Sequence, residues 1–282
     1  MNIKFVAETF ARGTFVIRFY ARDDVASVDH EPDLIRALKE VGAPVADVIS
    51  DSRTGPPAPL PYMVYEFIPG VSLADVYTST SREEQRSFAL QVGRFLAELA
   101  KLDVHGYGDL VTAQSGRYRS WHDFLAESFD SGLHAARSHG TLSAGLLKDL
   151  ATIRAAVERF DMPTRSRLAW GDVLLENILV RGSALVGVVD FEGTLAAEPA
   201  LNVGYCRAAH DGLPFASDLE DACSSATNPL DEDRSHLYAV LRGVRIARFA
   251  HLPLPTGSPR IPPERFLPGF ARAAEALARR LA

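Results

Sequence analysis

The sequence predicts an α+β fold of two lobes: a small, antiparallel β-rich lobe over residues 1–69 and a larger, mostly helical lobe over residues 70–282. Three observations lead to this prediction. Strand-forming segments separated by short turns fill the first part of the chain. From Leu73 onward the composition becomes rich in Ala and Leu, as in helices. The Pro69-Gly70 pair separates the two regions.

The first lobe is expected to hold a β-hairpin, one helix and two further strands. Strand formers on either side of an Ala-Arg-Gly turn predict the antiparallel hairpin. The helix ends at stop signals, a Gly and a nearby Pro. The expected strands cover residues 3–9, 14–20, 45–49 and 62–67, and the expected helix covers residues 29–41.

Glu31 is the unusual residue of this helix. It lies at the edge of the apolar stripe formed by Leu34, Ile35, Leu38 and Val41. A carboxylate at such an edge needs a cation as partner if it is buried. Alternatively, it is an exposed residue of the first turn that the helix dipole favours. The residues alone leave both interpretations open.

The second lobe is expected to be helical around one small hairpin. Two short apolar strands, residues 178–180 and 184–189, flank the tight turn Arg181-Gly182-Ser183. The Gly106-Tyr107-Gly108 segment is expected to be a loop. The expected helices cover residues 82–102, 120–138, 143–160, 199–210, 231–250 and 264–281.

Composition excludes several classes of protein. The formal charge is −6, whereas nucleic-acid-binding surfaces are usually basic. No window approaches the roughly 20 apolar residues that a membrane span needs, and the first residues lack a secretion signal. Two cysteines are too few for a disulfide framework or a four-ligand zinc site, so a cytoplasmic protein is expected. No oligomeric state follows from the sequence.

The stretch from Trp170 to Asn177, followed by the segment 189–192, points to chemistry. A hairpin centred near residues 182–183 places residues 175–177 across from residues 188–190, so Asn177 and Asp190 converge at its open end. Asp172 lies on the loop just before. These carboxylate and amide oxygens suit Mg²⁺. The alternative is that Asp172 and Asn177 make turn hydrogen bonds and Asp190 merely ends a strand.

This stretch resembles the catalytic segment of the aminoglycoside phosphotransferase / choline kinase-like family, whose members are relatives of protein kinases. There, H-G-D-x-x-x-x-N and I-D-[FW]-[ED] carry the chemistry. Further segments are similar to the family's phosphate-binding strand, the helix with its Glu, the hinge between lobes and the helix after the second metal segment. They are Phe15 to Arg18, His30 to Leu38, Val64 to Leu73 and Glu198 to Asn202.

The resemblance implies a protein-kinase-like fold and assigns three roles near the hairpin. Asp172 would accept or orient the proton of the substrate hydroxyl. Asn177 and Asp190 would hold Mg²⁺ against the nucleotide phosphates. Such positioning and charge neutralisation do most of the work in phosphoryl transfer.

The resemblance also assigns the nucleotide contacts of the first lobe. Arg18, fixed by Glu31, would contact the phosphates of ATP or GTP. The backbone of Tyr65 and Phe67 would hydrogen-bond the adenine. The Pro-Gly boundary then becomes the cleft between the lobes, a usual place for a ligand.

The sequence departs from the family pattern at three places. Trp170 stands where the family has His, and Arg18 stands where Lys is commoner, with Lys4 on the neighbouring strand as an alternative cation. The resemblance begins at Asn2, after the family's nucleotide-covering loop. The first strand and the Gly-rich loop are therefore expected to be missing, and no other phosphate-binding glycine motif occurs.

The predicted function is ATP-dependent O-phosphorylation of a small molecule. Residues 190–234 contain ten acidic and two basic side chains, and this negative stretch predicts a cationic acceptor. Both aminoglycosides and choline-like amines are cationic, and the family resemblance implies an aminoglycoside-type antibiotic as the first candidate. Alternatively, the stretch is a solvated acidic loop. Two other functions stay open: a metabolic kinase for choline, a sugar or an amino alcohol, and a catalytically impaired module that only binds nucleotide.

Overall fold

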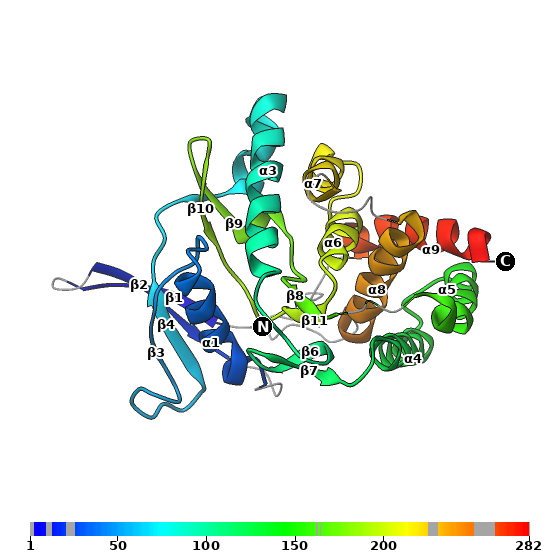
Figure 1. The fold of residues 1–282 in the computed structure, drawn as a ribbon, viewed down its shortest axis with the longest axis horizontal. Helices are drawn as coiled ribbons and strands as arrows, with labels where there is room; N and C mark the ends of the chain where they lie inside the picture. Colours follow the sequence, from blue (N-terminus) through cyan, green and yellow to red (C-terminus); the bar gives the residue numbers. More distant parts are fainter. Residues whose placement is uncertain are drawn as a thin grey trace.

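The computed structural model describes residues 3–9, 13–20, 26–161, 163, 165–224, 231–250 and 263–281. An antiparallel sheet and one helix form the N-terminal part, and helices dominate the rest (Figure 1), which confirms the predicted fold class. No helix in the described ranges has the length and apolar character that a membrane crossing requires.

The N-terminal sheet has four antiparallel strands in the order β1-β2-β4-β3. They are β1 (Ile3–Thr9), β2 (Gly13–Phe19), β3 (Val48–Asp51) and β4 (Tyr62–Glu66). The predicted hairpin is confirmed, and its register pairs Lys4 with Arg18. Directly opposite residues share one face of a sheet, so these two cations lie side by side. The strand predicted at residues 45–49 starts later, because residues 43–46 pack into the core without forming a ladder.

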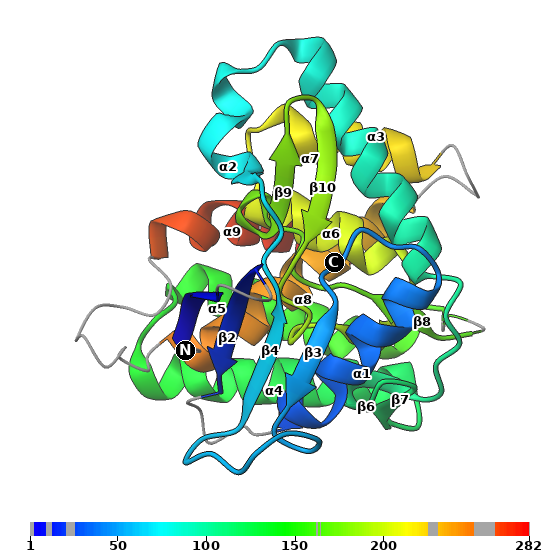
Figure 2. The ribbon, with the colours of Figure 1, turned by 90° about the vertical axis from the view of Figure 1, so that its left-hand side faces the viewer.

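Helix α1 (Ala26–Glu40) packs beside this sheet (Figure 2). Leu34, Ile35 and Leu38 are buried, as their helical spacing predicted. The fourth member of the predicted stripe, Val41, is 43% exposed. The helix ends at Glu40, so Val41 no longer follows the helical repeat.

A second sheet joins the two parts of the molecule. It contains β5 (Val71–Ser72), β9 (Ile178–Arg181) and β10 (Ala184–Val188) in the order β10-β9-β5. The side chain of Arg181 donates two hydrogen bonds to the Pro69 carbonyl, at 3.2 and 2.6 Å. At Gly70 an added Cβ would approach Val186 Cγ2 to 2.9 Å and the Val180 carbonyl oxygen to 3.1 Å, so a larger residue would force its neighbours to shift. The segment that connects the N-terminal part to the helical part is thus hydrogen-bonded to the hairpin.

A third sheet lies beneath the hairpin, in the order β7-β6-β11-β8. Its strands are β6 (Tyr107–Thr112), β7 (Ser115–Tyr118), β8 (Arg167–Ala169) and β11 (Leu195–Ala197). The prediction of a loop at residues 106–108 is therefore wrong for Tyr107 and Gly108, whereas Gly106 lies just before the strand. Gly106 and Gly108 have φ values of 69° and 79°, so the segment lacks the local strand pattern. Pairing with the adjacent strand β7 and with the distant strand β11 creates β6.

The helical part follows the predicted pattern with two additions, the short helix α2 and the helix α7. Helix α7 lies in the acidic stretch, and its charged residues hid the apolar face that includes Phe215 and Leu219. The helices are α2 (Leu73–Val76), α3 (Arg82–Leu99), α4 (Trp121–His139), α5 (Ala144–Ala156), α6 (Ala200–Ala209), α7 (Pro214–Ser224), α8 (Glu232–Ala250) and α9 (Pro263–Leu281), with 3₁₀ turns at Tyr77–Ser79, Val157–Arg159 and Leu175–Asn177.

Two hydrophobic clusters hold the molecule together. The first combines Leu34 and Met63 of the N-terminal part with Val92, Trp170 and Ile178 of the helical part. The second lies among α4, α5, α6, α8 and α9, on the right of Figure 1. Because the first cluster is shared, the sheet and the helical part meet through a continuous core, with the hairpin β9–β10 between them.

Candidate active site

Arg18 occupies the centre of a buried charge network. Its side chain is 2% exposed, and its Nη1 lies 2.7 Å from Glu31 Oε1. Its Nη2 lies 3.0 Å from Asp190 Oδ1 and 2.7 Å from Glu192 Oε2. The structure therefore brings Arg18, Glu31 and Asp190 together, and it adds Glu192, to which the sequence interpretation gave no role.

Glu31 is held on every side. It is 1% exposed, which rules out an exposed first-turn residue. Its Oε2 accepts a hydrogen bond from the Tyr20 hydroxyl at 2.6 Å, and its Oε1 accepts one from the Phe191 N–H at 3.1 Å in addition to the bond from Arg18. Burial raises the pKa of Glu31, although the charge of Arg18 opposes this shift. Through Glu31, helix α1 thus hydrogen-bonds the loop that carries Asp190.

Asp190 adopts a strained backbone conformation, with a φ of 68° that non-glycine residues seldom have. The indole N–H of buried Trp170 donates to the Asp190 carbonyl at 3.0 Å and fixes this turn. Lys4 Nζ approaches Asp190 Oδ2 to 3.4 Å. Burial alone would raise the pKa of Asp190, but the charges of Arg18 and Lys4 outweigh it and lower the pKa. Trp170 thus replaces the family's His with packing and one hydrogen bond.

Asp172 and Asn177 touch each other at the mouth of the hairpin. Asn177 Nδ2 donates to Asp172 Oδ2 at 2.9 Å and to the Asp172 carbonyl at 3.2 Å. The Val189 N–H donates to the Asn177 carbonyl at 3.0 Å, which places Asn177 beside Asp190 as the predicted hairpin required. Asp172 and Asn177 do make turn-type hydrogen bonds, so that alternative describes their local geometry. It does not account for the convergence with Asp190.

Arg242, on α8, holds the second oxygen of Asp172. Its Nη2 lies 3.3 Å from Asp172 Oδ1, and its Nη1 donates to the Gly171 carbonyl at 3.0 Å. Burial raises the pKa of Asp172, and the charge of Arg242 opposes the shift only in part. Because 70 residues separate the two side chains, no local pattern could reveal this contact.

The loop before Asp172 is supported from helix α6. The Gly171 N–H donates to Asn202 Oδ1 at 3.1 Å, so Asn202 positions the loop. Gly171 has a φ of 74°, and an added Cβ would lie 2.4 Å from the Gly193 carbonyl oxygen. Only glycine fits this combination of conformation and close approach. Both features fix the backbone immediately ahead of Asp172.

Asn177 and Asp190 provide hard oxygen donors of the kind that bind Mg²⁺. Because Asn177 uses its amide nitrogen toward Asp172, its amide oxygen is left for a cation. The donor set therefore fits the predicted metal. In the described ranges, no group of three or more His, Cys, Asp or Glu side chains could by itself hold a metal ion. A magnesium ion here would depend on phosphate and water for its other ligands.

The predicted adenine contacts are only partly compatible with the structure. Tyr65 lies in β4 in register with Val16 of β2. The Phe67 N–H, however, donates to the Thr14 carbonyl at 3.1 Å. That N–H is engaged in the sheet, so it does not face a nucleotide as a free donor. The extended β2–β4 pairing, which the sequence could not show, is the physical reason.

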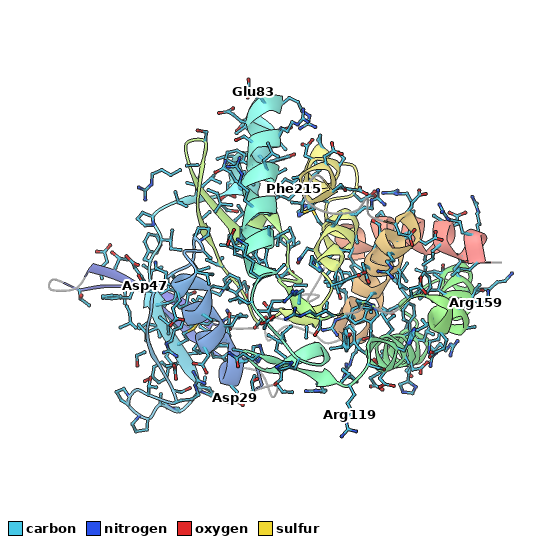
Figure 3. The ribbon with its side chains drawn as sticks, in the orientation of Figure 1. Asp29, Asp47, Glu83, Arg119, Arg159 and Phe215 are labelled. Atoms are coloured by element: carbon cyan, nitrogen blue, oxygen red, sulfur yellow. The ribbon has the colours of Figure 1, made fainter. Side chains whose placement is uncertain are left out.

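The acidic stretch does not form one negative field. Helix α7 lies on the side of α3 away from the N-terminal sheet, as Figures 1 and 3 show, with Phe215 labelled in Figure 3. Eight of the ten carboxylates form ion pairs with basic side chains: Asp190, Glu192, Glu198, Asp211, Asp218, Glu220, Glu232 and Asp233. The expected cationic acceptor therefore loses this support.

Comparisons with known proteins agree with this geometry. Solved structures of aminoglycoside phosphotransferases share the fold, and three of them illustrate the likeness. A thermostable mutant of APH(4)-Ia, described as a ternary complex with ADP and hygromycin B, is 18% identical, with a TM-score of 0.73 over 99% of this chain and 90% of that one. The streptomycin-ATP-APH(2")-IIa ternary complex is 16% identical, with a TM-score of 0.64 over 99% and 93%. ADP-bound APH(2'')-Ib is 15% identical, with a TM-score of 0.63 over 100% and 94%.

These likenesses define the class: the fold is that of the protein-kinase-like aminoglycoside kinases. A search of curated proteins finds no match. The model of the phosphotransferase enzyme family matches residues 4–224, which is well over half of the chain. The chain belongs to this family and is a small-molecule kinase.

Proposed function

We propose that this protein transfers the γ-phosphoryl group of ATP to a hydroxyl of a small molecule. The observation that carries the proposal is the convergence of Asp172, Asn177 and Asp190 at the end of one hairpin, beside Arg18. The bond between the γ-phosphorus and the bridging oxygen of ATP breaks as the acceptor oxygen bonds to phosphorus, and ADP leaves. Asp172 accepts the proton of the hydroxyl, and its raised pKa suits a group that takes up a proton.

The remaining predicted residues would hold the nucleotide. Asn177 and Asp190 would bind Mg²⁺, which neutralises phosphate charge when bound. Arg18 and Lys4 lie side by side on β2 and β1 and both contact Asp190, which supports a role for these cations in binding phosphate oxygens near the proposed metal ligands. We propose that the nucleotide lies between the lobes 1–69 and 70–282, with its base near Tyr65 and Phe67. GTP is the alternative nucleotide.

The acceptor class has two candidates. Aminoglycoside-type antibiotics are supported by the solved relatives, whose descriptions name hygromycin B and streptomycin. A hydroxylated metabolite is the second candidate. It is favoured by Arg242, a cation that contacts Asp172 directly where an approaching ammonium group would be repelled.

The test is to incubate the protein with Mg-ATP and a panel of aminoglycosides, sugars and amino alcohols, and to detect phosphorylated product by mass spectrometry. We expect Asp172→Asn to lose turnover. Asp221→Asn, which removes an exposed carboxylate from α7, should keep it. Nucleotide binding without transfer to any acceptor would instead favour the impaired binding module. Unchanged turnover in Asp172→Asn would refute its role as the base.

A further inference from the structure

A cavity of about 810 Å³ lies in the helical part of the molecule, away from the candidate active site. Its walls come mainly from α3, α6, the end of α7 and the start of α8, and Figure 1 shows α6 between α3 and α8. The described lining includes none of Arg18, Asp172, Asn177 and Asp190. Small-molecule pockets measure roughly 300–1,000 Å³, so this cavity is large enough for a ligand.

Helix α3 has one face toward this cavity and another toward the candidate site. Gly93, Ala97 and Ala100 recur at the spacing of a helix face and line the cavity. Phe95, on a different face, packs edge-on against the ring of Trp170, with the two centroids 5.7 Å apart. The cavity is therefore a separate space rather than an extension of the candidate active site.

Most of the cavity wall is nonpolar. The small side chains of Ala97 and Ala100 leave room beside α3, and Leu96, Phe160 and Val203 provide larger apolar surfaces. Ala97 is exposed, so a ligand can reach the cavity from this side. Removing an apolar group from water against such surfaces favours binding. A ligand with an apolar body therefore suits the cavity.

The strongest cations of the wall are engaged within the protein. Arg234 Nη1 lies 2.8 Å from Glu198 Oε2, and Arg234 Nη2 donates to the Asp161 carbonyl at 2.8 Å. Asp233 forms an ion pair with Arg280. These guanidinium groups are therefore not available to an incoming anion.

Two carboxylates of the wall have no such partner. Asp161 and Asp231 are exposed, and their carboxylates form no ion pair with any residue that the structure describes. Asp231 Oδ1 accepts a hydrogen bond from the Asp233 N–H at 3.1 Å and so caps α8. Arg159 is the one guanidinium of the described wall without an ion pair. Two unpaired carboxylates thus share the wall with one unpaired cation.

The charge of the wall stays negative when neighbouring groups are counted. Four carboxylates and two guanidinium groups line the cavity. Arg280 adds one cation, but it also pairs with Glu232, which adds one carboxylate. Arg207, whose charge reaches Glu232, brings its own partner Glu220. Each further cation therefore comes with a carboxylate, and the excess of two carboxylates favours a cationic ligand. The six charged lining residues are Asp161, Glu198, Asp231, Asp233, Arg159 and Arg234.

We propose that this cavity is a second ligand site, which binds a small amphipathic cation. The ammonium group of the ligand meets the carboxylates of Asp161 and Asp231, and its apolar body lies against Leu96, Phe160 and Val203. This site does not depend on the proposed phosphotransferase activity, because none of its described lining residues belongs to the candidate active site.

The test compares phenylpropylamine, phenylpropanol, phenylpropionate and propylamine. The first three share an apolar body and differ in charge, and the last keeps the ammonium group without the ring. Isothermal titration calorimetry of the full chain, without nucleotide, measures the dissociation constant of each probe. We expect phenylpropylamine to bind about tenfold more tightly than the others, the usual size of one charged hydrogen bond. Equal or tighter binding of any other probe, or no binding of phenylpropylamine at millimolar concentration, overturns the inference.

Charge variants locate the ammonium group. Asp161→Asn and Asp231→Asn each remove one exposed charge, and Asn also caps a helix, so the fold should persist. Each should raise the dissociation constant of phenylpropylamine by up to about tenfold and leave that of phenylpropanol unchanged. Glu83→Gln removes an exposed carboxylate at the other end of α3, labelled in Figure 3, and should change neither. No effect of the Asn variants, or an equal effect of Glu83→Gln, contradicts the proposed site.

Two further variants separate the cavity from the candidate active site. Ala97→Trp fills the cavity from its exposed side and should abolish binding of phenylpropylamine, with circular dichroism as the check on folding. Asp172→Asn should leave the dissociation constant unchanged. Retained binding in folded Ala97→Trp, or lost binding in Asp172→Asn, overturns the inference; if Ala97→Trp does not fold, the Asn variants decide. Because no nucleotide is present, a failure here leaves the proposed function untouched.

Discussion

Replacing Glu31 with Ala should break a large part of the buried charge network and lower the free energy of unfolding. Three donors lose their acceptor at once: Arg18 Nη1, the Tyr20 hydroxyl and the Phe191 N–H. A buried donor without a partner costs about 1–3 kcal/mol, and removing one member of a buried ion pair costs about 3–5 kcal/mol. Because Arg18 keeps Asp190 and Glu192, we expect a loss of about 3–5 kcal/mol rather than the sum. That is a large fraction of the roughly 5–15 kcal/mol that stabilises a typical domain.

Urea unfolding followed by circular dichroism measures the free energy of unfolding. The matched control is Glu192→Ala, since Glu192 contacts the same guanidinium but is 27% exposed. We expect it to cost under about 1 kcal/mol. Glu31→Gln keeps an acceptor and should remain folded, with a raised KM for ATP. If Glu31→Ala and Glu192→Ala destabilise equally, or if Glu31→Ala costs less than about 1 kcal/mol, the buried contacts of Glu31 do not stabilise the fold as proposed.

Three further outcomes are expected. Arg242→Gln should shift the acid limb of the kcat/KM profile to higher pH, because Arg242 lowers the already raised pKa of Asp172 and its loss lets that pKa rise further; an unchanged limb would contradict the assignment. Trp170→Phe should lower kcat, because it removes the hydrogen bond that fixes the strained Asp190 turn. The loss of that hydrogen bond should lower the free energy of unfolding by only about 1 kcal/mol. Steady-state kinetics measures the first effect and thermal unfolding the second. Gly171→Ala should abolish turnover through its positive φ and the close carbonyl, and full activity would refute that account.

Local patterns predicted most of the helices and the hairpin that carries the candidate site. The β9–β10 hairpin follows from two apolar runs around a tight turn, and its geometry implied that Asn177 and Asp190 meet. The Arg18–Glu31 contact rested on the family resemblance, since the residues alone left Glu31 as either buried or exposed. The structure places the pair at 2.7 Å.

What the sequence did not reveal depends on contacts between distant segments. Arg242 reaches Asp172 across 70 residues, and β6 pairs with the distant strand β11 as well as with the adjacent strand β7. The acidic stretch over residues 190–234 suggested a cationic acceptor because the ion pairs that its carboxylates form with distant segments cannot be read from the sequence. Its carboxylates form a run along the chain, but folding distributes them among basic partners on other elements, such as Arg82 and Arg234. Composition along a chain therefore does not give the potential at a site.

The loop that carries Asp190 is tied to both lobes at once. Covalently it continues β10 in the helical lobe, and the Trp170 indole holds its carbonyl from that side. From the other side, Arg18 and Glu31 of the first lobe hold the Asp190 carboxylate and the Phe191 N–H. A movement of the N-terminal sheet relative to the helical part would therefore stretch or break one set of these bonds. The position of the Asp190 carboxylate therefore depends on how the N-terminal sheet and the helical part sit against each other.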